Sequence, residues 1–260
     1  MAEVVIVDSG EAAGRLVADH IAEQVHLNPE MVLGVATGST PLSVYRELAR
    51  RRSQGVDFGR AWAFALDEYV GLPEGHPQSY RAVIDREVTV PLGLDPSHVN
   101  VPDGGDEGIE STGERYEAAL HARGGVDLQL LGIGTTGHIG FNEPGSSFGS
   151  LTRVKTLTEQ TRADNARFFD SPDEVPIHCV TQGLGTILRA RHLVLLAFGE
   201  GKAAAVAAAV EGPVTASLPG SAIQLHEHVT VVIDEAAASR LEHADYYRWA
   251  RDHKPSWQGI

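Results

Sequence analysis

The sequence predicts an α/β fold: a mostly parallel, open β-sheet with helices on both of its faces. Short runs rich in β-branched residues alternate with amphipathic or alanine-rich stretches, the order expected of strands joined by crossover helices. Several runs, such as LQLLGI, LVLLAF and VTVVI, are continuously apolar, as strands are when helices cover both faces of a sheet. No repeat, low-complexity tract or linker interrupts this alternation, so we expect one domain over residues 1–260.

The individual elements follow from this alternation. The apolar, β-branched runs predict strands at Val4–Val7, Met31–Ala36, Ala61–Asp67, Asp127–Gly132, His192–Phe198 and Val229–Asp234. The stretches between and after them predict helices at Gly10–Val25, Pro41–Arg52, Ser79–Val90, Ile109–Arg123, Lys202–Glu211 and Glu235–His243. Two connections, Glu68–Gln78 and Thr135–Ser150, are long and rich in Gly and Pro, and each follows a predicted strand. Because ligands of open α/β sheets bind beyond the carboxyl ends of the strands, we expect both loops to be functional.

Charge and composition argue against several classes of partner. The formal net charge of −14 argues against nucleic acid, which needs a basic face to displace counterions. No apolar run approaches the roughly 20 residues that span a bilayer, and the start MAEVVIVDSG lacks the features of a signal peptide. The single cysteine, Cys179, suits a reducing compartment and is expected to be buried, so we expect a cytoplasmic protein. Lys155 and Lys202, two of only three lysines, share a stretch with three arginines, which indicates either an anion site or scattered surface cations.

The segment ATGSTP, residues 36–41, indicates an anion-binding turn. A predicted strand ends, a Gly/Ser/Thr turn follows, and a helix is expected to begin at Pro41, where the missing N–H of proline costs little. Free backbone N–H groups and the positive end of the helix dipole favour an anion there, and Thr37, Ser39 and Thr40 add hydroxyl donors. The alternative is helix capping by Ser39 or Thr40. No Gly-Lys-Ser/Thr follows, so ATP chemistry is not indicated.

An acidic pair, Asp67 and Glu68, stands where an apolar strand is predicted to end. A partly desolvated carboxyl group at the edge of a sheet can have a raised pKa and act as a general acid or base. The alternative is that both residues cap the following turn.

The segment GIGTTGHIGFNEP, residues 132–144, is the most informative. It contains Gly-x-Gly-x-x-Gly after a strand, but the further Gly and Pro residues argue against the long helix of a dinucleotide site. The glycines more readily allow the backbone to approach a ligand and present His138 and Glu143 on a compact loop, as a general base with an orienting carboxylate. No third ligand stands at a diagnostic spacing, so we expect no metal. His226 and His228 are expected to be surface or core histidines rather than a metal-binding pair.

Six segments in the same order make the sequence similar to the glucosamine-6-phosphate deaminase family over nearly its whole length. They are ATGSTP (36–41), LDEYVGLPEGHPQSY (66–80), GHIGFNEP (137–144), TRVKTLT (152–158), TRADNARFF (161–169) and GKAAAVAAAVEGP (201–213). The resemblance implies a modified Rossmann-like fold, no cofactor, and the conversion of glucosamine 6-phosphate to fructose 6-phosphate and ammonia in amino-sugar catabolism.

The resemblance also implies roles for single residues. Asp67 matches the base that moves a proton between C1 and C2 of the opened sugar, and His138 the residue that opens the ring, with Glu143 holding its imidazole. The residues that match the grip on the substrate phosphate are Gly38, Ser39, Thr40, Arg167 and Lys202. Those that match a second phosphate site, where some members bind the effector N-acetylglucosamine 6-phosphate, are Ser146, Arg153, Lys155 and Thr156. The family includes both monomers and hexamers, so a homo-oligomer is also compatible with the resemblance.

Thr136 departs from the family, which usually has Asp or Asn two residues before the histidine. A threonine hydroxyl can accept a hydrogen bond but brings no negative charge, so we expect slower ring opening and Glu143 to take the larger share in orienting His138. Two alternatives remain: a related sugar-phosphate enzyme such as a 6-phosphogluconolactonase, and a sugar-phosphate sensor without catalysis.

Overall fold

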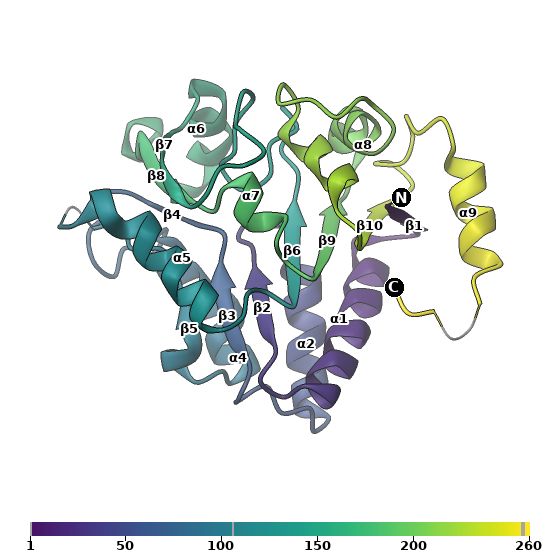
Figure 1. Cartoon of the computed structure of the whole chain (residues 1–260), viewed down its shortest axis with the longest axis horizontal. Coiled ribbons are helices and arrows are strands. Elements are labelled where there is room, and N and C mark those ends of the chain that lie inside the picture. The colour runs from purple at the N-terminus through teal and green to yellow at the C-terminus, as the bar shows by residue number, and fades with distance from the viewer. Residues whose placement is uncertain (1, 106, 256–257) are drawn as a thin grey trace.

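The main sheet of the protein is parallel throughout and has seven strands. In the computed structural model, which describes residues 2–105, 107–255 and 258–260, these are β1 (Glu3–Val7), β2 (Val32–Val35), β3 (Trp62–Ala65), β5 (Val99–Asn100), β6 (Leu128–Gly132), β9 (His192–Ala197) and β10 (Val229–Asp234). Their order is β1-β10-β9-β6-β2-β3-β5, and each neighbouring pair runs parallel. The carboxyl ends of these strands therefore share one edge of the sheet, which is the upper edge in Figure 1.

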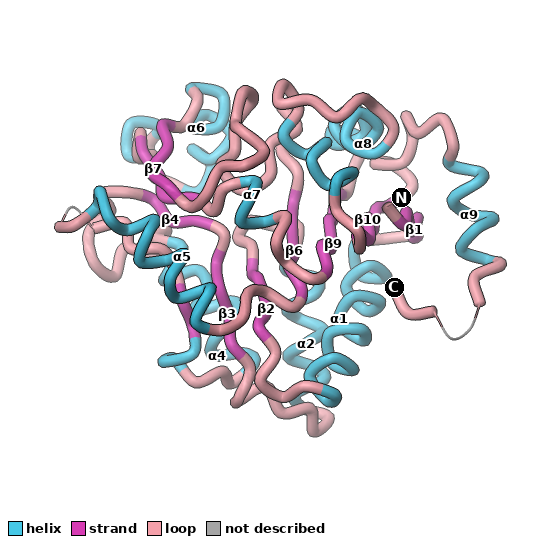
Figure 2. The backbone as a smooth tube through the Cα atoms, in the orientation of Figure 1, coloured by secondary structure: helices cyan, strands magenta, loops and turns pink. Residues whose placement is uncertain are grey.

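Helices cover both faces of this sheet, as the apolar strands predict. They are α1 (Gly10–Leu27), α2 (Leu42–Ser53), α3 (Tyr80–Ile84), α4 (Val90–Leu92), α5 (Thr112–Ala122), α6 (Glu159–Asn165), α7 (Leu184–Ile187), α8 (Ala203–Val210) and α9 (Ala244–Asp252). Side chains of α1, α2 and α3 pack with Val5 and Val7 of β1 in one apolar core, and those of α5, α7 and α8 pack with Val4 and Ile6 in another. Figure 2 shows α1 and α2 on one side of the strands and α5 and α7 on the other. Alternation along a strand thus builds two cores, and the predicted fold class is confirmed.

A second, antiparallel sheet lies above the carboxyl edge of the main sheet (Figure 1). It consists of β4 (Asp67–Tyr69), β8 (His178–Thr181) and β7 (Arg153–Thr156) in the order β4-β8-β7. The sequence analysis did not predict this sheet. Its own small core contains Tyr69, Phe141 and the fully buried Cys179.

Three predicted elements differ from the structure. The helix expected at Ser79–Val90 is divided into α3, a π-helical segment at Asp85–Thr89 and α4. The strand expected at Ala61–Asp67 ends at Ala65, and Asp67 begins β4, because the backbone of residues 67–69 pairs with the distant β8 rather than with the main sheet. The helix expected at Glu235–His243 is wrong: these residues form turns, and the C-terminal helix is α9. The carboxylate of Asp234 accepts the backbone N–H groups of Ala237 (2.8 Å) and Gly199 (3.0 Å), so the turn after β10 is held against the loop after β9.

The helices in the described part of the chain are all too short or too polar to cross a membrane.

Candidate active site

A cavity of about 670 Å³ lies at the carboxyl edge of the main sheet, beyond the ends of β2, β3, β6 and β9. This is the place where open α/β sheets bind ligands. Segments that are far apart in the sequence meet there. Among the residues that line it are Gly38, Ser39, Thr40, Asp67, His138, Arg167 and Lys202.

The turn after β2 lines this cavity. Gly38 has a φ of 90°, a left-handed conformation that favours glycine, and a Cβ there would meet no atom within 4 Å. Helix α2 begins at Leu42 after Pro41, one residue later than expected, and no side chain caps it. The alternative role of Ser39 or Thr40 as a helix cap is therefore absent, and both hydroxyls stay available to a ligand.

Two cations, Arg167 and Lys202, line the same cavity. Arg167 lies in the 3₁₀ turn Ala166–Phe168 that continues α6, and Lys202 stands at the N-terminal end of α8. Burial lowers the pKa of Lys202, Asp164 opposes this effect, and the positive charge of Arg167 adds to it. Both cations therefore lie close enough together to contact the same part of a ligand.

Asp67 is the buried carboxyl group of the cavity, with 5% of its surface exposed. Burial, with a smaller contribution from the neighbouring Glu68, raises its pKa to about 8. Glu68 is held differently: its carboxylate accepts the backbone N–H groups of Tyr69, Tyr80 and Arg81 at 2.7–2.8 Å, so it organises the 68–81 loop. Of the acidic pair, Asp67 alone lines the cavity, with a pKa suited to proton transfer near neutral pH.

His138 is presented by the glycine-rich loop after β6. A Cβ on Gly134 would come within 2.2 Å of the imidazole ring, so only glycine leaves room for the ring at this place. Gly140 plays a similar part nearer Asp67: its φ is 55°, and a Cβ would meet the Thr181 hydroxyl at 3.0 Å and the Asp67 carboxylate at 3.5 Å. The glycines therefore allow side chains from three segments to approach one another.

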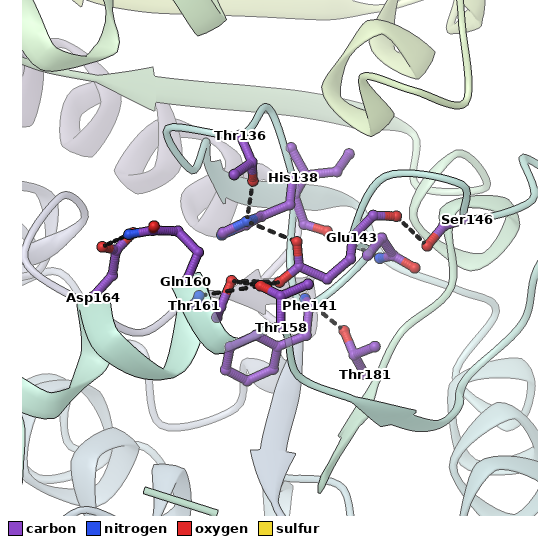
Figure 3. Close-up of polar contacts among 12 residues, drawn as sticks. Thr136, His138, Phe141, Glu143, Ser146, Thr158, Gln160, Thr161, Asp164 and Thr181 are labelled. Carbon is purple, nitrogen blue, oxygen red and sulfur yellow. Dashed lines mark hydrogen bonds and ion pairs between the residues drawn. The ribbon is translucent and has the colours of Figure 1, made fainter. Parts of the chain in front are cut away.

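Thr136 and Glu143 both approach the same ring nitrogen of His138 (Figure 3), and neither is among the residues that line the cavity. The Thr136 hydroxyl lies 2.9 Å from Nδ1 of His138, whereas Oε2 of Glu143 lies 3.6 Å from the same nitrogen. The expectation that Glu143 takes the larger share in orienting the ring thus differs from the structure, because the Thr136 hydroxyl lies closer to Nδ1 than the Glu143 carboxylate does. An acceptor-only carboxylate beside Nδ1 favours a proton on Nδ1 and leaves Nε2 as the free base.

Glu143 itself is held by two hydroxyl groups that the sequence analysis did not single out. Burial on its own would raise the pKa of Glu143, but His138 and the hydroxyls of Thr161 and Thr158 outweigh burial, so that this pKa is lowered. Thr158 is the N-cap of α6, and the signal that could have located it is a threonine directly before the helix formers Glu159 and Gln160.

The residues expected at a second phosphate site are not brought to one face. Arg153 and Lys155 alternate with exposed residues on β7 and share its half-buried face, whereas Thr156 is exposed on the opposite face. Ser146 is buried, and its hydroxyl donates to the carbonyl of Glu143 at 2.7 Å. The period of two in a strand thus separates Thr156 from the two cations.

The histidine pair near β10 has partners within the fold. Nε2 of His226 lies 2.6 Å from the carbonyl oxygen of Ala190, and the ring of His228 stacks on His192 at 3.7 Å between centroids. Within residues 2–105, 107–255 and 258–260, no group of three or more His, Cys, Asp or Glu side chains is arranged to hold a metal ion.

The fold and the cavity together define an α/β protein with a polar, cation-lined cavity beyond the carboxyl ends of a parallel sheet. The family model described as glucosamine-6-phosphate isomerases/6-phosphogluconolactonase matches residues 8–232. The chain is 62% identical over 259 residues to a glucosamine-6-phosphate deaminase of Rhodococcus opacus, covering 99% of this chain and 100% of that protein. It is 61% identical over 260 residues to one of Streptomyces coelicolor, with the same coverage.

Solved structures agree with these relatives. A monomeric glucosamine-6-phosphate deaminase superposes with a TM-score of 0.89 at 41% identity, over 92% of this chain and 100% of that one. A 6-phosphogluconolactonase from Leishmania guyanensis shares the fold, with a TM-score of 0.72 at 22% identity over 92% and 98% of the two chains. The chain belongs to the glucosamine-6-phosphate isomerase/6-phosphogluconolactonase family.

Proposed function

We propose that the chain is a glucosamine-6-phosphate deaminase, which converts glucosamine 6-phosphate and water to fructose 6-phosphate and ammonia. Relatives with this name match it over their full length. The observation that carries the mechanism is the pairing of a buried carboxyl group, Asp67, with a histidine, His138, in one cavity that also holds an anion-binding turn.

Substrate binding begins with the phosphate group. The backbone and hydroxyl groups of Gly38, Ser39 and Thr40, with the cations of Arg167 and Lys202, are the groups we assign to it. Fixing the phosphate at one end of a hexose places C1 and C2 toward the interior of the cavity. The bound substrate then loses less translational and rotational freedom during the reaction, which lowers the activation barrier. Because the formal net charge of the protein is −14, binding of a phosphate group depends on this local concentration of positive charge.

His138 is the group we assign to ring opening. Its Nε2 takes the proton of the C1 hydroxyl and returns a proton to the ring oxygen, which breaks the bond between C1 and that oxygen. Glu143 and Thr136 hold Nδ1 during this exchange. A histidine is suited to both halves of the step because it can accept and donate a proton near neutral pH.

Asp67 is the group we assign to isomerisation. As a carboxylate it takes the proton from C2 of the open aldehyde and delivers it to C1, while a proton of the substrate's ammonium group passes to the aldehyde oxygen. C1 thereby becomes a hydroxymethyl carbon, and a protonated imine is left at C2. Water then adds to C2, and ammonia departs to give the ketone. The pKa of about 8 makes the carboxylate of Asp67 a strong enough base for this proton. The ammonium group of the substrate favours the ionised form in the complex.

A direct assay tests the function. Ammonia released from glucosamine 6-phosphate is measured by coupling to glutamate dehydrogenase, beside an assay for hydrolysis of 6-phosphogluconolactone. We expect ammonia release and no lactone hydrolysis. We expect Asp67→Asn to lose turnover by about 10²- to 10⁴-fold while it still binds substrate. Asp19→Asn, at an exposed carboxylate on α1, is the matched control.

The outcomes separate the alternatives. Lactone hydrolysis without ammonia would favour a 6-phosphogluconolactonase, and binding without either product would favour a sensor. Wild-type turnover in Asp67→Asn would remove Asp67 from the role assigned to it.

Three further points stay predictions. Activation by N-acetylglucosamine 6-phosphate, which the resemblance assigns to Ser146, Arg153, Lys155 and Thr156, is tested by adding that compound to the assay; of these residues, Arg153 and Lys155 share one face of β7. A homo-oligomer is tested by sedimentation of the purified protein. A cytoplasmic location agrees with a single, buried and unpaired cysteine and is tested by cell fractionation.

A further inference from the structure

The two carboxylate oxygens of Glu143 have different partners, and this difference suggests which residue fixes the orientation of the side chain. Its Oε1 atom accepts the hydroxyl of Thr161, and the hydroxyl of Thr158 lies 3.1 Å from the same atom. Its Oε2 atom is buried without a hydrogen-bond partner and points toward His138, 3.6 Å from Nδ1 (Figure 3). An unpaired oxygen on a buried carboxylate is costly, so something must fix this orientation.

We propose that Thr161 is a positioning residue for the reaction, because its hydroxyl holds one oxygen of Glu143 and thereby turns the other toward His138. This inference rests on the proposed function. It assigns a role to a residue on α6, a helix that the sequence analysis did not predict.

Thr161 is better placed than Thr158 for this task. The Thr158 hydroxyl lies 3.1 Å from both Glu143 and the hydroxyl of Thr161, so its single proton can serve only one of them at a time. The Thr161 hydroxyl donates to Glu143 and is 3% exposed at the residue level, so water does not compete for it. Thr161 therefore supplies the constant donor.

Helix capping does not account for the Thr161 hydroxyl. The N-cap of α6 is Thr158, whose hydroxyl accepts the backbone N–H of Thr161 at 3.1 Å. The side chain of Thr161 adds nothing to this cap. Its bond to Glu143 instead joins α6 to the loop that carries His138.

The placement of α6 gives this bond a consequence for the reaction. Thr161, Asp164 and Asn165 lie three and four residues apart on one side of α6, and all three line the cavity. Arg167 follows directly in the adjoining 3₁₀ turn. One short segment thus contacts the phosphate region at one end and the carboxylate behind His138 at the other.

Removing the hydroxyl tests the proposal. In Thr161→Val, a nearly isosteric change, we expect kcat for glucosamine 6-phosphate to fall about 10- to 100-fold, since orientation of the dyad is lost. KM should stay within about threefold, because the phosphate contacts are untouched. The pKa of the Glu143 carboxyl group, followed by ¹³C NMR, should rise, because Glu143 loses a donor that favours its charged form. Thr161→Ser should restore both kcat and this pKa.

Thr112→Val is the matched control. Thr112 is also buried in the first turn of a helix, and its hydroxyl donates to the carbonyl of Asp103 at 2.8 Å, outside the cavity. We expect Thr112→Val to lose about as much thermal stability as Thr161→Val, with its kcat unchanged. Thr161→Ala removes the same hydroxyl without β-branching and replaces Thr161→Val should the valine variant not fold.

The results decide the proposal separately from the function. A Thr161→Val enzyme with wild-type kcat and an unchanged pKa of Glu143, or a Thr161→Ser enzyme as impaired as the valine variant, overturns it. Absence of ammonia release by the wild type would overturn the proposed function instead. In that case ¹³C NMR titration of the Glu143 carboxyl decides: its pKa must be higher in Thr161→Val than in the wild type, and equal values overturn the proposal.

Discussion

Replacing Asp67 by asparagine should make the protein more stable while it removes turnover. The carboxyl group of Asp67 is 5% exposed, and burial raises its pKa from 3.8 to about 8. The folded protein therefore keeps this group protonated at pH values where the unfolded chain has already ionised it. An asparagine side chain has nearly the same shape and no such charge to suppress, so the variant is free of this pH-dependent cost.

The sign and size of the effect follow from proton linkage. Between the unfolded pKa of 3.8 and the folded pKa of about 8, the folded state binds one proton more than the unfolded state. Stability from this group is thus fully present below pH 3.8 and is lost as pH rises toward 8, at about 1.4 kcal/mol per pH unit. From pH 5 to pH 8 the wild type should lose up to about 4 kcal/mol of unfolding free energy relative to Asp67→Asn.

Urea unfolding followed by circular dichroism measures this difference. Both proteins are unfolded at pH 5, 6.5 and 8, and the difference in unfolding free energy is plotted against pH. We expect the unfolding free energy of Asp67→Asn to rise steadily relative to that of the wild type as the pH increases across this range. A difference that stays constant with pH, or one that shrinks, would show that Asp67 is ionised in the folded protein and would refute the reasoning.

Three other changes test separate parts of the structure. Thr136→Asp places a carboxylate beside Nδ1 of His138, which should stabilise the imidazolium and raise turnover of cyclic substrate by about threefold to tenfold; unchanged or lower turnover contradicts this view of the site. Gly14→Ala should destabilise the protein by about 2 kcal/mol in urea unfolding, because a Cβ would meet the carbonyl oxygen of Ser43 at 2.6 Å, and this clash outweighs the better helix propensity of alanine. His192 has its pKa lowered to about 3, first by burial and then by neighbouring histidines. The stability contributed by the neutral His192 is therefore lost as pH falls below 6.5. Between pH 7 and pH 5, the unfolding free energy of His192→Gln should fall by about 2 kcal/mol less than that of the wild type.

Matched variants control the last two measurements. A Cβ on Gly10, in the same helix as Gly14, would meet only the Phe198 ring at an ordinary 3.5 Å, so Gly10→Ala should be nearly neutral. His121 is exposed on α5, so His121→Gln should leave the acid sensitivity of stability as it is in the wild type. Equal effects in each pair would remove the clash or the buried histidine as the cause.

The convergence of the main site segments could be predicted from the sequence. The turn at 36–41, the acidic pair and the glycine-rich loop each follow an apolar run, and the carboxyl ends of parallel strands meet at one edge. Local chemistry and one topological rule were sufficient to bring Asp67 and His138 to one cavity. Their chemical roles rest on the resemblance and on the proposed mechanism.

The antiparallel sheet and α6 could not be predicted in the same way. Strands β4, β7 and β8 have three or four residues each, and β4 finds its partner only when the chain returns at Cys179–Thr181. Their pairing is decided by tertiary contacts, which outweigh weak local propensities. The hydroxyls behind Glu143 were missed for the same reason, because nothing near Thr158 or Thr161 in the sequence points to a carboxylate 15 or 18 residues away.

The pairing of β4 with β8 bears on when the enzyme could first work during synthesis. Asp67 pairs with Thr181, and the carbonyl of Leu66 accepts the N–H of Gln182 at 2.8 Å. A nascent chain that has reached only β6 already carries the turn at 36–41, Asp67 and the strands that bear them, but lacks the strand that holds Asp67 in place. Such a chain can contain native helices and most of a sheet while the carboxyl group of Asp67 remains unplaced, so we expect the cavity to assemble only after residue 182, and then Lys202, have emerged from the ribosome.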